Sequence, residues 1–295
     1  MEILKSKRLD HLKYEIRGPV YDKALALQNQ GYKITSLNIG NPAAFGFESP
    51  DEIVHDIIVN IRNAQGYVDS RGLFAARKAV MQYYQNAGVK NILIEDIYIG
   101  NGVSELISLV MTALLNTEDE VLIPSPDYPL WTTVVGLAGG NAVHYECKEE
   151  DEWNPDLSDI ESKITSKTRA IVLINPNNPT GNLIISKDEL EALLVKFPRS
   201  VFFIDEAYFR FVEPTLDSSK ATLIKKYNNL LVSCSFSFAY GLAGARIGYV
   251  IASPELVRTA ESKVTAYTIG KLQEDIAIAS LEDTDHMVYV RKVTA

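Results

Sequence analysis

Residues 170–181 have the sequence AIVLINPNNPTG, and residues 201–208 have the sequence VFFIDEAY. Each segment begins with a short apolar run and continues into polar residues, which is typical of a strand buried on both faces. Similar runs alternate with helical patterns along the middle of the chain, as in DIYIGNG (96–102) followed by VSELISLVMTALL (103–115). This alternation predicts an α/β fold in which helices cover both faces of a mostly parallel sheet, giving three α/β/α layers.

Polar residues follow four of the predicted strands, at the point where each strand ends. They are residues 101–104, residues 175–181, Asp205 and residues 235–237. Ligands of open α/β sheets bind outside the carboxyl ends of the strands. We therefore expect these four loops to meet at one edge of the sheet and to form a binding site.

The composition narrows the classes of partner. The 295 residues carry a formal net charge of −9, with an isoelectric point near 5.1. This balance argues against nucleic acid or an anionic membrane as the main partner, because both bind basic surfaces. No stretch reaches the roughly 18 apolar residues of a membrane span, and the first residues lack the apolar core of a signal peptide, so we expect a cytoplasmic protein.

The cysteines and histidines predict neither a disulfide framework nor a metal site. Cys147 and Cys234 lie far apart without CxxC spacing, and both are expected to be reduced and buried. The four histidines share no metal-ligand spacing; they are His11, His55, His144 and His286.

A glycine-rich loop precedes a predicted helix in GNGVSELI (100–107). The backbone N–H groups of Val103 and Ser104 can point at a bound anion there, with the helix dipole behind them. The alternative is a plain glycine turn in which Ser104 and Glu105 begin the helix.

A second loop with anion-binding groups lies in SCSFSFAYGLAGARIGYV (233–250). Ser235 and Ser237 offer hydroxyl groups, and Arg246 offers a guanidinium fork that suits a phosphate. These residues predict a small anion as ligand.

The remaining candidates suit a flat, nitrogen-containing ring. Asp205 ends an apolar strand, so it needs a cationic partner, and a protonated ring nitrogen of a cofactor is one candidate. Tyr208 could hydrogen-bond the same ligand, Asn178 is presented by the NPNNPTG turn, and Tyr128 could stack on a planar ring. The alternatives are a helix-capping acid at Asp205, a surface turn around Asn178 and core packing of Tyr128.

Taken together, NPNNPTG, DEAY, the AYGLAGARIGY segment and the glycine loop resemble the class I and II aminotransferases, which are pyridoxal 5′-phosphate (PLP) enzymes of fold type I. The resemblance covers nearly the whole chain. Residues 1 to about 181 resemble bacterial alanine aminotransferases, for example in QGYVDSRGLFAARKAVMQYY (65–84), and later residues resemble histidinol-phosphate aminotransferases, for example in AYGLAGARIGYVIASPELV (239–257). This difference between the two parts leads to the hypothesis that the chain is recombined or engineered, with a seam just after Gly181.

The resemblance implies a role for each candidate. Asp205 would meet the pyridine nitrogen, Asn178 and Tyr208 the phenolic oxygen of the ring, and Tyr128 the ring face. Gly40 matches a position beside the substrate carboxylate. Tyr67 matches a tyrosine that reaches the phosphate of the neighbouring subunit, which implies a homodimer. The phosphate would be held by Val103, Ser104, Ser235, Ser237 and Arg246.

One departure from the family concerns the chemistry directly. The family has a lysine that forms the Schiff base with PLP and moves the substrate proton, and this chain has Phe238 at that position. A phenyl ring has neither a nucleophilic nitrogen nor a titratable proton. Lys263 and Lys271 lie downstream, and nothing in their sequence context marks either as a replacement.

The resemblance also predicts a domain division. We expect an N-terminal arm at residues 1–39, a PLP-binding large domain with a seven-stranded sheet at residues 40–252, and a partial small domain at residues 253–295. The chain ends before the segment that carries the family's arginine for the substrate carboxylate.

Three functions remain open from the sequence. The first is an aminotransferase that binds PLP non-covalently and has impaired turnover of an amino donor and an oxo acid acceptor. The second is a non-catalytic or engineered scaffold that keeps the fold. The third, a phosphate-binding module unrelated to PLP, would have no use for Asp205.

Overall fold

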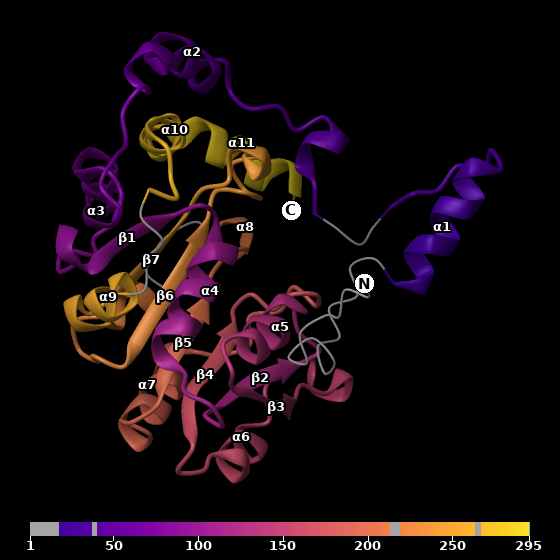
Figure 1. The fold of residues 1–295 in the computed structure, drawn as a ribbon, viewed down its shortest axis with the longest axis vertical. Coiled ribbons are helices and arrows are strands. Elements are labelled where there is room, and N and C mark those ends of the chain that lie inside the picture. The colour runs from indigo at the N-terminus through magenta and orange to yellow at the C-terminus, as the bar shows by residue number, and fades with distance from the viewer. Residues whose placement is uncertain (1–17, 37–39, 213–218, 263–266, 295) are drawn as a thin grey trace, which may run out of the picture.

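A seven-stranded sheet forms the centre of the protein (Figure 1). The computed structural model describes residues 18–36, 40–212, 219–262 and 267–294. The strands within these residues are β1 (Ile97–Gly100), β2 (Glu120–Ser125), β3 (Asn141–Glu146), β4 (Thr168–Ile174), β5 (Val201–Asp205), β6 (Leu230–Ser235) and β7 (Gly248–Ala252).

The strand order is β1-β7-β6-β5-β4-β2-β3. Strands β2 to β6 pair in parallel, whereas β7 is antiparallel to both of its neighbours, β1 and β6. The predicted mostly parallel sheet is therefore confirmed. The parallel strands end at one edge, which brings the loops after β4, β5 and β6 together.

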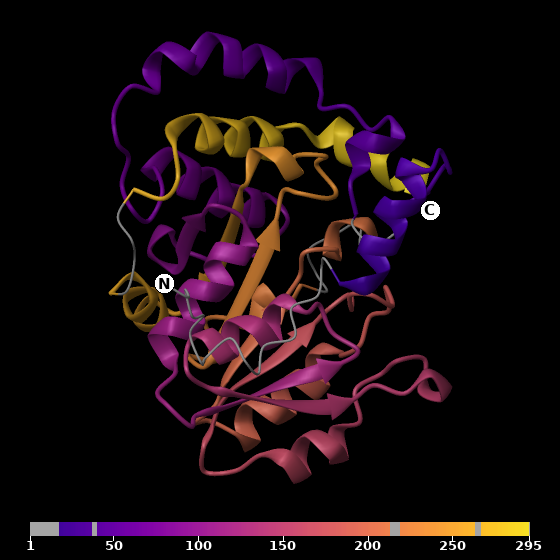
Figure 2. The same cartoon turned by 45° about the vertical axis from the view of Figure 1, so that its right-hand side comes forward.

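Helices cover both faces of this sheet, as Figure 2 shows from a second side. One face packs on α4 (Val103–Leu114), α5 (Leu130–Leu137) and α9 (Pro254–Glu261). The other packs on α3 (Phe74–Asn86), α6 (Leu157–Lys163), α7 (Lys187–Lys196), α10 (Lys271–Glu282) and α11 (Thr284–Thr294). Successive strand residues alternate between the two faces, so Val172 belongs to the first core and Leu173 to the second. The three-layer prediction is confirmed.

Local sequence signals explain where several of these helices begin. The Ser186 hydroxyl accepts the Glu189 N–H at 3.2 Å, while the Glu189 carboxylate accepts the Ser186 N–H at 2.8 Å, and this reciprocal pair starts α7. Helix α9 begins with Pro254 directly after Ser253, whose hydroxyl accepts the Leu256 N–H.

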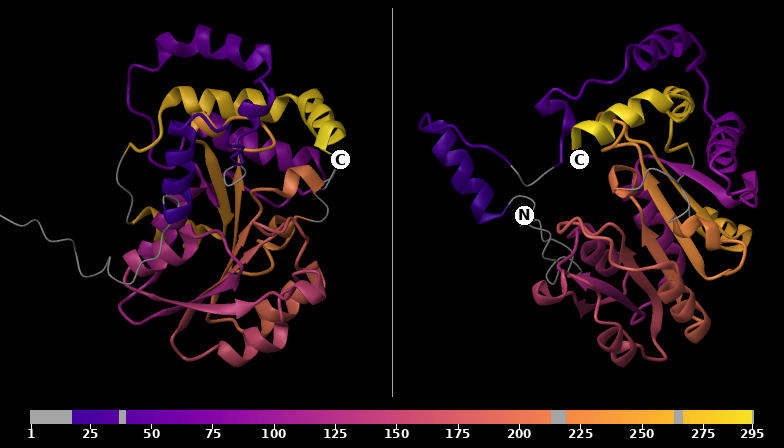
Figure 3. Two further views of the ribbon diagram at one scale, coloured as in Figure 1. Left: turned by 90° about the vertical axis from the view of Figure 1, so that its right-hand side faces the viewer. Right: turned by 180° about the vertical axis from the view of Figure 1, so that it is seen from behind.

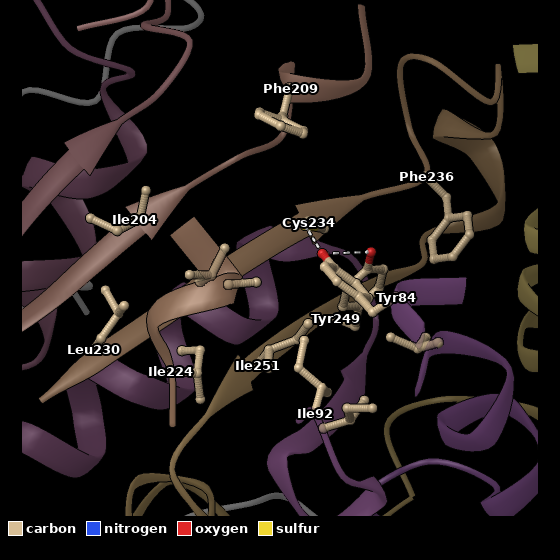
Figure 4. Close-up of a cluster of buried hydrophobic side chains, with 14 of the residues drawn as sticks. Tyr84, Ile92, Ile204, Phe209, Ile224, Leu230, Cys234, Phe236, Tyr249 and Ile251 are labelled. Atoms are coloured by element: carbon tan, nitrogen blue, oxygen red, sulfur yellow. Dashed lines mark hydrogen bonds between the residues drawn. The ribbon is translucent and has the colours of Figure 1, made fainter. Parts of the chain in front are cut away.

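A buried group of side chains lies on one face of β5, β6 and β7 (Figure 4). The Tyr84 hydroxyl lies 3.5 Å from the Cys234 sulfur and 3.4 Å from the Tyr249 hydroxyl. The buried Arg210 guanidinium donates to the Tyr249 hydroxyl at 3.1 Å and lies 4.3 Å from the centre of the Tyr83 ring. These contacts join α3 to the strands that carry the polar loops. Cys147 and Cys234 are both buried and free, as expected.

The remaining helices and the 3-10 turns lie at the periphery. Helix α1 (Pro19–Asn29) has no buried residue and stands apart from the sheet in Figures 1 and 3. Helix α2 (Asp51–Asn60) packs on α10, and α8 (Phe209–Val212) packs on α11. Short 3-10 turns lie at Pro42–Phe45, Ile61–Asn63, Ile94–Asp96, Glu149–Asp151, Lys220–Leu223 and Ala243–Ala245.

The division into an arm, a large domain and a partial small domain stays a prediction, and residues 1–17 of the arm lie outside the described residues. In the part of the chain that the structure describes, no helix is long and apolar enough to cross a membrane. The same residues contain no group of three or more His, Cys, Asp or Glu side chains placed to hold a metal. His11 lies outside them.

Candidate active site

A cluster of Gly102, Arg246 and Gly248, called the cup below, lies where β1 meets β7. Gly102 caps α4 with a φ of 79°, and a Cβ atom at this position would lie 2.6 Å from Nη2 of Arg246. Gly248 pairs with Gly100, and a Cβ atom on Gly248 would lie 2.8 Å from the backbone nitrogen of Val103. A side chain at position 248 would therefore collide with the start of α4, and the positive φ of Gly102 favours glycine at that position.

The charges of this cup favour an anion. A guanidinium beside a helix N-terminus places positive charge against a positive dipole end, which is unfavourable unless a negative group lies between them. The Glu105 carboxylate accepts the Asn101 N–H at 2.6 Å and offsets part of this charge. The Arg246 Nη1 also donates to the Ala243 carbonyl at 3.0 Å, which fixes the direction of the exposed guanidinium.

The serine loop borders the same cup. Ser235 pairs with Gly248 across β6 and β7, and its hydroxyl accepts the Ser237 N–H at 2.9 Å. Both serines are buried. In the sheet, Ser235 of β6 and Gly100 of β1 thus lie on opposite sides of Gly248, and α4 begins shortly after Gly100. Ser104 is the second residue of α4, and its backbone N–H is among those that a helix start leaves unpaired.

Replacing Arg246 by methionine is expected to weaken binding of inorganic phosphate at least tenfold, because a charge-assisted guanidinium contact contributes about 1.5–3 kcal/mol. Phosphorus NMR titration would measure the dissociation constant. Arg258→Met is the matched control, since Arg258 is an exposed arginine on α9. Equal affinities for the two variants would contradict an anion site at Arg246.

Asp205 lies at the end of β5, between Ile174 of β4 and Ser233 of β6. One carboxylate oxygen accepts the Ser233 hydroxyl and the Ala207 N–H, each at 3.1 Å. Burial raises the pKa of Asp205 to about 6, against 3.8 for an unperturbed aspartate. Among the described residues no salt bridge involves Asp205, so this buried acid suits a cationic ligand group.

An aromatic wall stands beside this acid. The Tyr208 and Phe238 rings stack with their centres 4.3 Å apart and their planes at 17°. A Cβ atom on Gly40 would lie 3.2 Å from the Phe238 ring and 3.7 Å from the Tyr208 hydroxyl. Burial raises the pKa of Tyr208 to about 12, and the nearby Asp205 and Tyr128 add to this rise. The structure therefore brings Gly40, Tyr128, Asp205, Tyr208 and Phe238 together.

The NPNNPTG loop uses two of its asparagines to fix its own shape. The Asn175 side-chain oxygen accepts the Ile184 N–H at 2.8 Å, and the Asn177 oxygen accepts the Thr180 hydroxyl at 3.1 Å. The Asn175 N–H donates to the Asp205 carbonyl at 2.8 Å, which ties the loop to β5. Asn178 is half-buried in this loop.

Tyr67 differs from the other candidates. It is 85% exposed, and its ring lies 4.5 Å from the Tyr267 ring. The structure does not bring it into the pocket that this chain itself forms. Its expected role at the site of a neighbouring subunit stays a prediction.

Two contributors were missing from the sequence-based set. Ser233 holds the Asp205 carboxylate, and Gln273 of α10 donates to the Ala245 carbonyl at 3.2 Å beside the anion cup. Ser233 could have been found, because it lies two residues before Ser235 and so shares its strand face. Gln273 carried no local signal, since its contact depends on how α10 packs.

Comparisons with known proteins identify the family of this chain. Residues 32–293 match the family described as aminotransferase class I and II. The chain is 49% identical over 250 residues to the glutamate-pyruvate aminotransferase AlaA of Haemophilus influenzae, an alignment covering 84% of this chain and 61% of that protein. It is 34% identical over 229 residues to histidinol-phosphate aminotransferase 2 of Carboxydothermus hydrogenoformans, covering 77% of this chain and 60% of that protein.

The fold agrees with solved structures as well. The crystal structure of an aminotransferase from Escherichia coli superposes with a TM-score of 0.83 at 43% identity, covering 95% of this chain and 71% of that chain. The chain spans about three fifths of the length of the curated relatives it matches. On the family match, the shared fold and the arrangement of its loops, the chain belongs to the class I and II aminotransferases, a family that depends on PLP.

Proposed function

We propose that this chain binds PLP without a covalent bond and that its transaminase turnover is strongly impaired. One observation carries the proposal: Phe238, at the family's lysine position, stacks on Tyr208 and lies against Gly40, and Tyr208 lies near the buried Asp205. The non-catalytic scaffold remains the alternative, and the experiment below separates the two.

The described residues fit the two polar ends of PLP. Glycine at positions 102 and 248 lets the Arg246 guanidinium and the Val103 backbone N–H approach closely, and both could contact a phosphate group there. Asp205 is a buried acid whose raised pKa falls once a protonated pyridine nitrogen lies beside it. Ser104, Ser235 and Ser237 would complete the phosphate contacts, while Tyr128, Asn178 and Tyr208 would hold the ring.

The same residues do not provide for covalent attachment or proton transfer. PLP supplies an electron sink for the substrate carbon when it is bound. Phe238 offers no base to take the proton from that carbon, and loss of such a base typically costs about 10²- to 10⁴-fold in rate. The Tyr208 hydroxyl is no substitute, because burial raises its pKa to about 12 and keeps it neutral near pH 7.

The substrate class we propose is a small amino acid with its oxo acid, as in the name of the Haemophilus influenzae glutamate-pyruvate relative. The higher identity to that relative than to the histidinol-phosphate relative supports this choice. We also propose a cytoplasmic homodimer in which Tyr67 reaches the neighbouring site. Its exposure of 85% supports a contact outside the chain.

A join between two subfamilies after Gly181 stays a hypothesis. The 250-residue alignment with the Haemophilus influenzae protein is longer than residues 1–181, so it crosses the proposed seam. Separate comparisons of residues 1–181 and 182–295 with both subfamilies would test it, and equal preference in both halves would remove it.

The test of function uses the whole chain incubated with PLP, then gel filtration, an absorption spectrum, borohydride reduction and intact mass. We expect retained PLP without a mass gain. Asp205→Ala should lower PLP affinity at least tenfold, because the ring nitrogen loses a charged partner. A permanent mass gain would show that another lysine attaches PLP and would overturn the proposal. Absence of retained PLP would leave only the scaffold.

A further inference from the structure

A cavity of about 240 Å³ lies between the segment after Gly40, the Phe238 loop and α11. It shares Gly40, Tyr208 and Phe238 with the site described above. The residues assigned to the phosphate and to the pyridine nitrogen do not line it. The cavity therefore borders the proposed PLP site but does not include the residues assigned to these two ends of PLP.

Aromatic rings form one side of this cavity. Phe238 stacks on Tyr208 at 4.3 Å, and Tyr208 stacks on Phe211 at 6.3 Å with planes at 28°, so three rings lie in layers. Phe47 also lines the cavity, and Val290 of α11 faces it. Flat apolar molecules gain favourable ring–ring contacts at such a wall.

The lining excludes charged ligands. It contains no Asp, Glu, Lys or Arg among the described residues, and its titratable side chains are Tyr208 and His286. The His286 Nε2 lies 3.3 Å from the Ala239 carbonyl. An amino acid would bring an ammonium and a carboxylate into this cavity without charged partners, and their desolvation opposes binding.

We propose that this cavity binds a neutral, flat aromatic compound with one hydrogen-bonding group, a ligand class different from PLP and from amino acids. Its size supports this, since an apolar protein cavity of roughly 150 Å³ already binds benzene, and 240 Å³ admits two fused rings. Phe238 supplies part of the wall, where a lysine would place a charged amine. The proposal goes beyond the proposed function and does not depend on PLP binding.

The test is calorimetric titration of the whole chain with indole, a neutral two-ring compound, and with tryptophan, which has the same rings and two charges. We expect indole to bind with a dissociation constant on the order of 10⁻⁴ M. Tryptophan should bind at least tenfold more weakly. No detectable indole binding at millimolar concentration, or equal affinity for tryptophan, would overturn the proposal.

Variants of the lining residues test whether indole binds in this cavity. Val290→Phe should weaken indole binding at least tenfold by filling the cavity, whereas Val288→Phe on the same helix should not, because Val288 is 64% exposed and does not line it. Phe238→Lys provides a second test at the opposite wall and should also weaken binding. Unchanged affinity in both Val290→Phe and Phe238→Lys would place indole elsewhere.

Discussion

Phe238→Lys is expected to give a protein that attaches PLP covalently and gains transaminase activity of about 10²- to 10⁴-fold in the proton-transfer step. The reason is positional. The Phe238 ring already lies against Gly40 and Tyr208, and Tyr208 lies near Asp205, so a lysine there would bring its amine next to the proposed cofactor ring. Borohydride reduction followed by intact mass would detect the bond, and alanine with an oxo acid would serve as the substrate pair.

The matched control is Phe238→Arg, which adds the same charge but no nucleophilic amine, because arginine stays protonated in proteins. It should bind PLP without mass gain after reduction. If the lysine variant also shows no mass gain while it retains PLP, the position of Phe238 is not the position of the missing amine.

Glu274→Gln is expected to stabilise the protein by about 3 kcal/mol at pH 8, with little difference from the parent at pH 4.5. Burial raises the pKa of Glu274 to about 7, against 4.5 for an unperturbed glutamate, and the charges of Asp275 and Asp69 add to the rise. One carboxylate oxygen accepts the Leu73 N–H, whereas the other is buried and has no hydrogen-bond partner among the described residues. A glutamine keeps the first contact and removes the buried charge.

The direction with pH follows from the raised pKa. Folding favours the protonated form of Glu274, so the penalty is absent below pH 4.5, grows as the pH rises and is complete above about pH 7. Urea unfolding of both proteins between pH 4.5 and pH 8 would measure this difference. Glu282→Gln, an exposed change on the same helix, should show no such dependence. A constant difference across the range would show that folding does not shift the pKa of Glu274.

Local patterns were sufficient to predict the sheet and the positions of its loops. The apolar runs ending at Ile174 and Asp205 are short, bounded by polar residues and followed by helical periodicity, which together specify buried parallel strands. Because parallel strands end at one edge, the meeting of Asp205 with the serine loop followed from chain order. The antiparallel direction of β7 could not be predicted in this way, since an apolar run such as GYVIA carries no information about the direction of its neighbouring strands.

The parts that sequence could not supply depend on long-range packing. The contact between Gly40 and Phe238 joins segments nearly two hundred residues apart in the chain, and no local period reports it. The same holds for the cavity, which needs α11 to lie beside the Phe238 loop. The burial of the Glu274 carboxylate could not be predicted for a similar reason, because a glutamate on a helix with mixed polarity gives no sign of burial.

The place of β7 in the sheet has a consequence for how the protein is made. β7 lies between β1 and β6, so β1 has to wait for a partner that emerges from the ribosome roughly 150 residues later. Until residues 248–252 have been synthesised, Gly100 lacks the strand that brings Arg246 to the start of α4. The cup is therefore among the last parts of the sheet to assemble, and a growing chain acquires it only after the parallel strands β2 to β6 have all been synthesised.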